Sequence, residues 1–116
     1  MTHTKRTLVA YILGRKILNN QVETIYDHTT GNNLFFNGEL GDAINIYDAT
    51  RASYITGNDK EIYDTATNEY INYEINESSF TGYDTETRTY FSGTVEANTI
   101  TINDAEDNNY YIFNLQ

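Results

Sequence analysis

The chain has 116 residues, 39% apolar and 21% charged, and this length suits one domain with one hydrophobic core. Its 11 Tyr and 5 Phe residues supply the aromatic area of a folded core, which excludes a disordered segment. The net charge of −10 argues against direct binding of nucleic acid or an anionic membrane, and the absence of Cys excludes disulfides, thiolate nucleophiles and Cys-ligated metals.

The N-terminal segment differs in charge from the rest of the chain. Residues 1–21 hold four of the seven basic residues and no acidic residue, whereas residues 22–116 hold all 17 acids. This asymmetry predicts electrostatic complementarity within the fold. The apolar run Leu8–Leu13 is too short for a signal peptide or a membrane span. We therefore expect a cytoplasmic protein without membrane contact.

Residues 8–18 fit two kinds of secondary structure. Their apolar positions match a helical stripe, but Tyr11–Gly14 also resembles the second half of a unit repeated later in the chain. The β-branched and aromatic residues of this segment favour an extended conformation. We predict a strand here.

A repeated unit follows, with starts 16 to 21 residues apart. In four units an Asp precedes an aromatic residue by six positions, and the first unit has two extra residues in its loop. Two short strands and their turns fit this period, which predicts a β-hairpin for each unit. The units cover residues 25–38, 46–57, 62–73, 82–93 and 102–113.

Symmetric closure of each hairpin sorts the side chains onto two faces. One face holds the predicted cross-strand pairs Tyr47 with Tyr54, Tyr63 with Tyr70, Tyr83 with Tyr90, and Asn103 with Tyr110. The opposite face holds Ile46 with Ile55, Ile62 with Ile71, Gly82 with Phe91, and Ile102 with Tyr111. Because a slip of one residue would exchange the faces, this sorting predicts the register, with the isoleucine face in the core.

These hairpins predict an all-β fold, an antiparallel up-and-down meander of about eleven strands in a single domain, residues 1–116. One apolar face must be hidden, so we expect a barrel-like closure or a strongly bent two-layer sheet. Dimerisation through that face is the third possibility. In an open sheet, the terminal strands would offer edges for self-association with another copy.

The pattern YDxxTxxYxxG is complete at Tyr83, Asp84, Thr87, Tyr90 and Gly93. It resembles the hairpin repeat of small bacterial proteins, mostly without assigned activity, and is distantly similar to the YD hairpins of large secreted toxin shells. The resemblance covers residues 25–113 and implies hairpins but no function or site residue. The chain lacks the Gly-Asn-Gly turns of the toxin shells and is too short to enclose cargo.

No arrangement of residues points to catalysis. The only histidines are His3 and His28, no Ser/His/Asp nucleophile motif is present, and no glycine-rich loop precedes a predicted helix. The acidic run Asn103–Asn108 lacks the central Gly and the closing Glu of a calcium loop. We expect no enzyme activity, no catalytic residue, no metal site and no cofactor.

The candidate binding residues lie near the hairpin turns, where Asp can accept hydrogen bonds from the turn backbone. Their simplest role is to stabilise the hairpins. The functional hypothesis is an acidic, tyrosine-rich recognition face made of Tyr47, Tyr54, Tyr63, Tyr70, Tyr83 and Tyr90 with Asp48, Asp64 and Asp84.

Three kinds of partner suit this face. The first is a protein with a basic surface, which would make the chain a non-enzymatic interaction or assembly module. The second is the basic nucleic-acid-binding groove of a defence complex, which a small acidic inhibitor of the phage type would occupy. The third is carbohydrate stacked on the phenol rings, although the Trp that sugar sites favour is absent.

Overall fold

The computed structural model describes residues 1–116, and it begins with a helix, α1, over His3–Leu18. The side chain of Thr2 caps the helix by accepting a hydrogen bond from the Lys5 backbone N–H, and Asn19 ends it in the left-handed conformation at φ 53°. The strand predicted for residues 8–18 is therefore wrong. The run Leu8–Leu13 is apolar on every side, which is typical of a helix surrounded by protein.

Ten antiparallel strands follow and form a closed up-and-down barrel. Each strand pairs with its neighbours in the chain, and the first and last strands close the barrel with Ile25 opposite Leu115. The all-β meander and the barrel-like closure are confirmed, with ten strands instead of about eleven because the leading segment is helical. The strands are β1 Thr24–Asp27, β2 Asn32–Leu40, β3 Ile44–Asp48, β4 Ser53–Gly57, β5 Glu61–Asp64, β6 Glu69–Asn76, β7 Ser79–Asp84, β8 Thr89–Glu96, β9 Thr99–Asp104 and β10 Asn109–Leu115.

The predicted hairpin register is confirmed. Tyr47 lies opposite Tyr54, and the other predicted pairs of the tyrosine face are also in register. On the isoleucine face, Ile46, Ile62 and Ile102 are fully buried. The alternation of side chains along each strand therefore divides an inner apolar face from an outer polar face.

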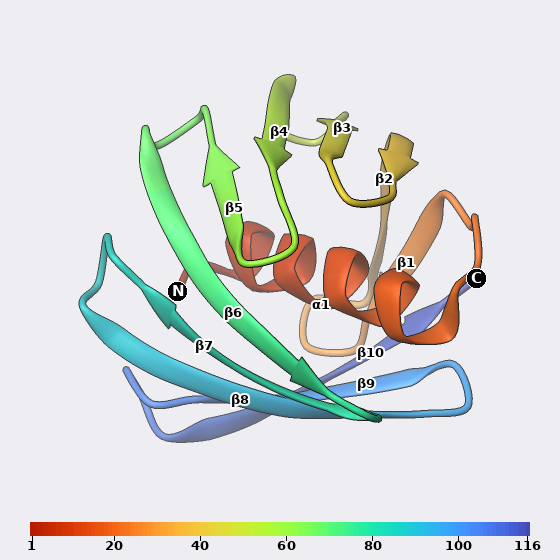
Figure 1. The fold of residues 1–116 in the computed structure, drawn as a ribbon. Helices are drawn as coiled ribbons and strands as arrows, with labels where there is room; N and C mark the ends of the chain where they lie inside the picture. The colour runs from red at the N-terminus through yellow and green to blue at the C-terminus, as the bar shows by residue number, and fades with distance from the viewer.

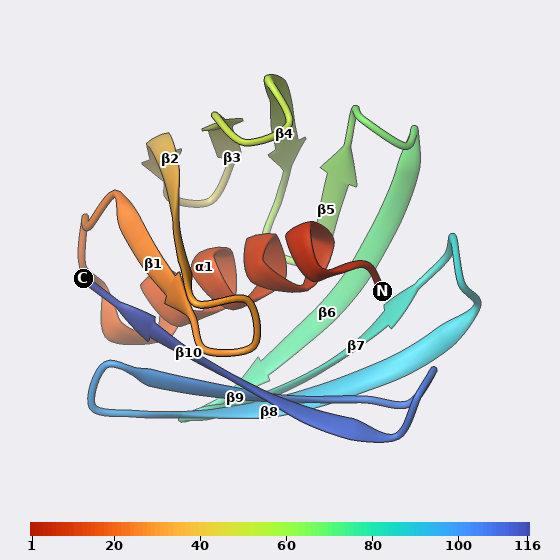
Figure 2. The same cartoon turned by 180° about the vertical axis from the view of Figure 1, so that it is seen from behind.

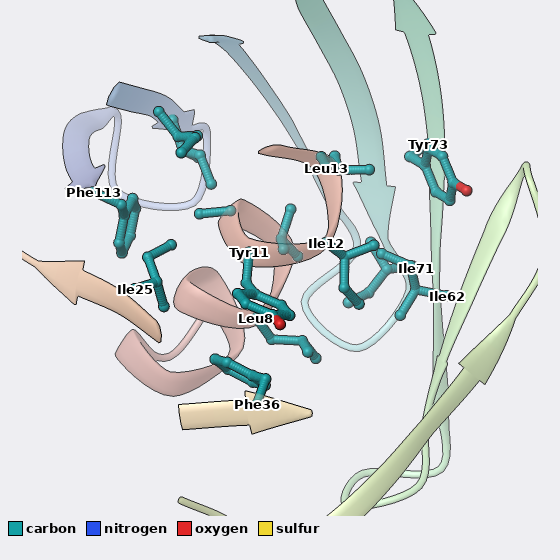
Figure 3. Packing of buried hydrophobic residues seen from close by; sticks show 14 of the residues in the cluster. Leu8, Tyr11, Ile12, Leu13, Ile25, Phe36, Ile62, Ile71, Tyr73 and Phe113 are labelled. Carbon is teal, nitrogen blue, oxygen red and sulfur yellow. The ribbon is translucent and has the colours of Figure 1, made fainter. Parts of the chain in front are cut away.

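Helix α1 fills the interior of the barrel, with strands on all sides of it (Figures 1 and 2). Residues 5–15 are all buried, and Figure 3 shows Leu8, Tyr11, Ile12 and Leu13 among apolar side chains of the wall. The ring of Tyr11 stacks on Phe36 with centroids 4.4 Å apart. The helix thus supplies the centre of the core.

The two ends of the barrel differ. The N-terminus of α1 lies at the end that carries the five turns within the hairpins, and we call this the ring end. The C-terminus of α1 lies at the opposite end with the connections between hairpins, and we call this the cleft end. No helix of the protein combines the length and the apolar character that crossing a membrane requires.

Candidate functional site

All five hairpins share one turn geometry. The two extra residues predicted for the first loop are wrong, because Asp27 lies opposite Asn32, five residues later, just as Asp48 lies opposite Ser53. In each hairpin, the Asp that ends the first strand accepts a hydrogen bond through Oδ1 from the backbone N–H two residues later, at 2.9 to 3.1 Å. The residue four positions after the Asp has positive φ in every turn, and these residues are Gly31, Ala52, Asn68, Arg88 and Asn108. The repeated Asp therefore has a structural role in every turn, as the sequence suggested.

The same five aspartates point into the barrel. Each directly follows an outward-facing residue, as Asp48 follows Tyr47, so strand alternation turns its carboxylate inward. We call this set the aspartate ring: Asp27, Asp48, Asp64, Asp84 and Asp104, each no more than 1% exposed. The predicted recognition face needs correction here, because Asp48, Asp64 and Asp84 do not share the outer surface with the tyrosines.

Cations of α1 and of the residue at the start of the chain contact two members of the aspartate ring. Lys5 Nζ lies 2.8 Å from Asp84 Oδ1, and Arg6 Nε lies 3.3 Å from Asp104 Oδ2. The ammonium of Met1 lies 2.9 Å from the same Asp104 oxygen. Burial by itself lowers the pKa of Lys5, but hydrogen bonds to Asp84 and Glu86 outweigh it, and the pKa is raised. The predicted complementarity between the basic N-terminal segment and the acidic body is confirmed in these pairs.

Arg51 forms ion pairs with two further aspartates. Its Nε lies 2.8 Å from Asp48 Oδ2, and its Nη1 lies 2.7 Å from Asp64 Oδ2 in the next hairpin. Burial again opposes the charge, but the two carboxylates raise the pKa of Arg51 above its ordinary value. The aspartate ring is thus largely neutralised inside the protein.

The outer face of the same hairpins carries aromatic side chains. Tyr47 and Tyr54 form an edge-to-face pair with ring centroids 5.0 Å apart. The two predicted pairs of the next hairpins, Tyr63 with Tyr70 and Tyr83 with Tyr90, each have centroids 4.8 Å apart. In each pair the tyrosine on the first strand is half-buried and the one on the second strand is exposed. The structure therefore brings the six predicted tyrosines together as three pairs on neighbouring hairpins.

Every hairpin has one exposed aromatic residue on the outer face of its second strand. In four hairpins it lies six residues after the Asp, and in the first hairpin Asn33 takes that position and Phe35 lies two residues farther on, opposite Thr24. We call this set the aromatic collar: Phe35, Tyr54, Tyr70, Tyr90 and Tyr110, which are 57%, 60%, 48%, 69% and 73% exposed. Phe35 and Tyr110 were not among the predicted site residues. The place of Tyr110 in the repeated unit was the signal that could have included it, whereas Phe35 lies at a different position of its hairpin.

The outer surface is also strongly acidic. Outside the aspartate ring lie the other twelve of the 17 acids, and none of the twelve is buried. Four of the seven bases are occupied elsewhere, since Lys5, Arg6 and Arg15 are buried and Arg51 binds the ring. The bases left on the surface are Lys16, Lys60 and Arg88.

Two hollows open at the ends of the barrel. A polar cleft of about 1440 Å³ lies at the cleft end, where Arg15 and Lys16 of α1 face strand ends that carry Glu39, Glu61 and Glu74. A smaller pocket of about 260 Å³ lies at the ring end beside Asp27. No three His, Cys, Asp or Glu residues are grouped so that they could hold a metal ion.

The chain matches no protein-family model, no curated protein and no solved structure.

Proposed function

We propose that the protein is a non-enzymatic interaction module that binds a basic protein surface through the aromatic collar. The observation that carries this proposal is the exposure of one aromatic ring on the outer face of every hairpin, 48% to 73%. A cross-strand aromatic pair stabilises a sheet by about 0.2 to 1 kcal/mol. Such pairing does not account for Phe35 and Tyr110, which lie opposite Thr24 and Asn103.

Tyrosine suits this role because it offers a large, rigid contact area at a low cost in conformational entropy. The collar lies on a surface with twelve acids and three bases, so a basic partner matches its charge. The acids of the surface replace the buried aspartates in the predicted face. Among them, Glu69 and Asp107 lie at the ring end, in the same hairpins as the collar. Glu86 and Glu106 lie there too, but they pair with Lys5 and the Met1 ammonium.

Substitution of three collar residues tests the proposal. Capture of proteins from the source cells with wild type identifies candidate partners, and each candidate is then purified and titrated by calorimetry. The triple variant Tyr54→Ala, Tyr70→Ala, Tyr90→Ala should weaken binding at least a hundredfold, since aromatic residues at an interface centre contribute ~2 kcal/mol or more each.

The same strands offer a matched control. Thr56, Asn72 and Ser92 are exposed on the outer face, two residues beyond the three collar tyrosines. The triple alanine variant at these positions should bind like wild type. Equal affinity for both triple variants, or the absence of any basic partner, would contradict the proposal.

The acidic surface separately favours a second candidate, occupation of a basic nucleic-acid-binding groove. Such a complex should weaken steeply with added salt and should compete with DNA for the same protein. Salt-insensitive binding without competition leaves the first candidate. Carbohydrate binding is the third candidate and predicts saturable shifts of the collar tyrosines on titration with soluble oligosaccharides.

A further inference from the structure

Four members of the aspartate ring have a cation within the protein, and the fifth does not. Asp104 pairs with the Met1 ammonium and Arg6, Asp84 pairs with Lys5, and Asp48 and Asp64 share Arg51. The partner is an ammonium or a guanidinium group in every case. The five turns therefore place five carboxylates alike but supply counter-charges to four.

Asp27 is the unpaired member, although only 1% of it is exposed. Its Oδ1 accepts a hydrogen bond from the Thr29 backbone N–H at 2.9 Å, and its Oδ2 accepts a long one from Thr7 Oγ1 at 3.4 Å. Both donors are neutral. Burying a carboxylate without a counter-charge costs free energy. The dipole at the N-terminus of α1 acts on all five aspartates, so it does not remove the difference between Asp27 and the four paired ones.

The small pocket at the ring end lies beside this carboxylate. It measures about 260 Å³, and besides Asp27 its lining includes Thr7, Thr30, Thr50 and Asn33. Asp27 is the only acidic residue in the lining, and no Lys or Arg contributes to it. A guest in this pocket would meet one negative charge among hydroxyl and amide groups, whose oxygens accept from N–H donors, and the imidazole of His3.

The second hairpin shows how a cation can occupy the place three residues after the Asp. Arg51 lies three residues after Asp48 and reaches Asp64 of the following hairpin. In the third and fourth hairpins a threonine stands there and donates to its own Asp. Thr30 lies three residues after Asp27, so the first hairpin has a short hydroxyl side chain where the second has a guanidinium. Thr50 from the second turn also lines the pocket, which places the pocket between the first two hairpins as Arg51 lies between the second and third.

We propose that this pocket binds an ammonium or guanidinium group of a ligand, which completes the charge pairing of the aspartate ring. The donor is a small amine or the side chain of a lysine or arginine on a partner protein, and both present the same chemistry. A multivalent metal ion fits poorly, because a single carboxylate faces the pocket. The proposal is independent of the aromatic collar, since no collar residue lines the pocket.

Titration of the isotope-labelled protein with n-butylammonium and with ethylguanidinium, followed by amide NMR, tests this site. We expect saturable shifts at Thr7, Thr30 and Thr50. Asp27→Asn keeps an oxygen that can accept from Thr29 but removes the charge, and it should weaken binding at least tenfold. Asp42→Asn removes an exposed acid between β2 and β3, at the cleft end, and should bind like wild type.

A second variant tests the site without removing Asp27. Thr30→Arg introduces the guanidinium of the second hairpin at the matching position of the first, where it should fill the pocket from within. We expect this variant to fold, to resist urea better than wild type and to lose the response to both probes. Binding that persists unchanged in Thr30→Arg and in Asp27→Asn would overturn the proposal.

Further arms distinguish the sources of the ligand. A short peptide with one lysine should shift the same amides if a partner side chain enters, and its acetylated form should not. Binding of butylammonium without the lysine peptide would assign the pocket to a small amine. Potassium chloride at equal ionic strength is the salt control, and equal shifts with it, or no saturable shift with either organic cation, would overturn the proposal.

Discussion

Lys5 and Lys16 belong to the same helix, yet their pKa values shift in opposite directions at the two ends of the barrel. At the ring end, hydrogen bonds to Asp84 and Glu86 more than offset burial and raise the pKa of Lys5. At the cleft end, burial dominates and lowers the pKa of Lys16, whose Nζ donates to the Gly41 carbonyl at 2.8 Å. The acids nearest to Lys16 act only at longer range.

The difference shows that a carboxylate in direct contact, more than the net charge of the protein, decides whether the pKa of a desolvated lysine is raised or lowered. The whole chain carries −10, but this excess does not keep the pKa of Lys16 at its ordinary value. The ring end orders carboxylates at hydrogen-bond distance through the hairpin turns. The cleft end also carries acids, but none of them contacts Lys16, and the cleft is open to water.

Among changes at the two ends, removal of Lys5 should have the largest effect on the free energy of unfolding. Lys5→Ala leaves Asp84 buried without a counter-charge, and breaking a buried pair in this way costs about 3 to 5 kcal/mol in the free energy of unfolding. Urea unfolding followed by circular dichroism measures the loss. Lys60→Ala removes an exposed lysine and should change the free energy by less than ~0.5 kcal/mol.

A double variant separates the loss of charge pairing from the loss of packing. Replacement of both partners by apolar residues, in Lys5→Met with Asp84→Leu, should recover part of the stability that Lys5→Ala loses, because no unpaired charge is left inside. The turn then lacks its Asp acceptor, so recovery is incomplete. A loss below about 1 kcal/mol for Lys5→Ala would show that the ring end tolerates unpaired charge.

Tyr73 offers a test of intermediate size at the cleft end. Burial raises its pKa to about 12 from an ordinary value of 10.0, and its hydroxyl donates to the Asn58 carbonyl at 2.6 Å. Because the pKa is higher in the folded state, the stability linked to the neutral hydroxyl is full below pH 10 and is lost between pH 10 and about pH 12. The linked loss at its upper limit is about 2.7 kcal/mol.

Tyr73→Phe should therefore be less stable than wild type at neutral pH and more stable at high pH. At pH 7 the variant lacks one hydrogen bond and should be less stable by about 1 kcal/mol. Near pH 12 it escapes the linked loss and should be the more stable protein. Urea titrations from pH 7 to pH 12 measure both, and parallel pH profiles would show that the Tyr73 hydroxyl ionises freely in the folded protein.

The hairpin wall could be predicted from sequence because its pattern has a period of two. Ile46 and Tyr47 alternate between core and surface, and the repeat fixes which residues face each other across the turn. The same rule places Asp48 inside, one residue after Tyr47. The prediction grouped Tyr47 and Asp48 by their shared position near the turn and did not apply the alternation to the aspartate.

The helix could not be predicted from its own residues alone. The side chains of Tyr11 and Ile12 suit a strand, and their helical conformation depends on a closed barrel whose interior surrounds them. Better signals lay at the ends, where Thr2 caps the first turn, Arg15 and Lys16 occupy the last, and Asn19 ends it. The lack of a counter-charge at Asp27 could not be predicted either, because it depends on which cation reaches which turn in the folded protein.

The smallest expected effect concerns Lys16, the other half of the comparison. Lys16→Met removes a partly buried ammonium that has no carboxylate in contact, so relief from desolvation offsets the lost hydrogen bond to Gly41. We expect a change within ~0.5 kcal/mol at pH 7. Because the pKa of Lys16 is lower in the folded state, its destabilising contribution is present at neutral pH and fades as the pH rises toward 10.5, so the variant should be favoured most at neutral pH. A loss above about 1 kcal/mol in urea unfolding would mean that Lys16 has a charge partner comparable to that of Lys5, and the two ends would then treat their cations alike.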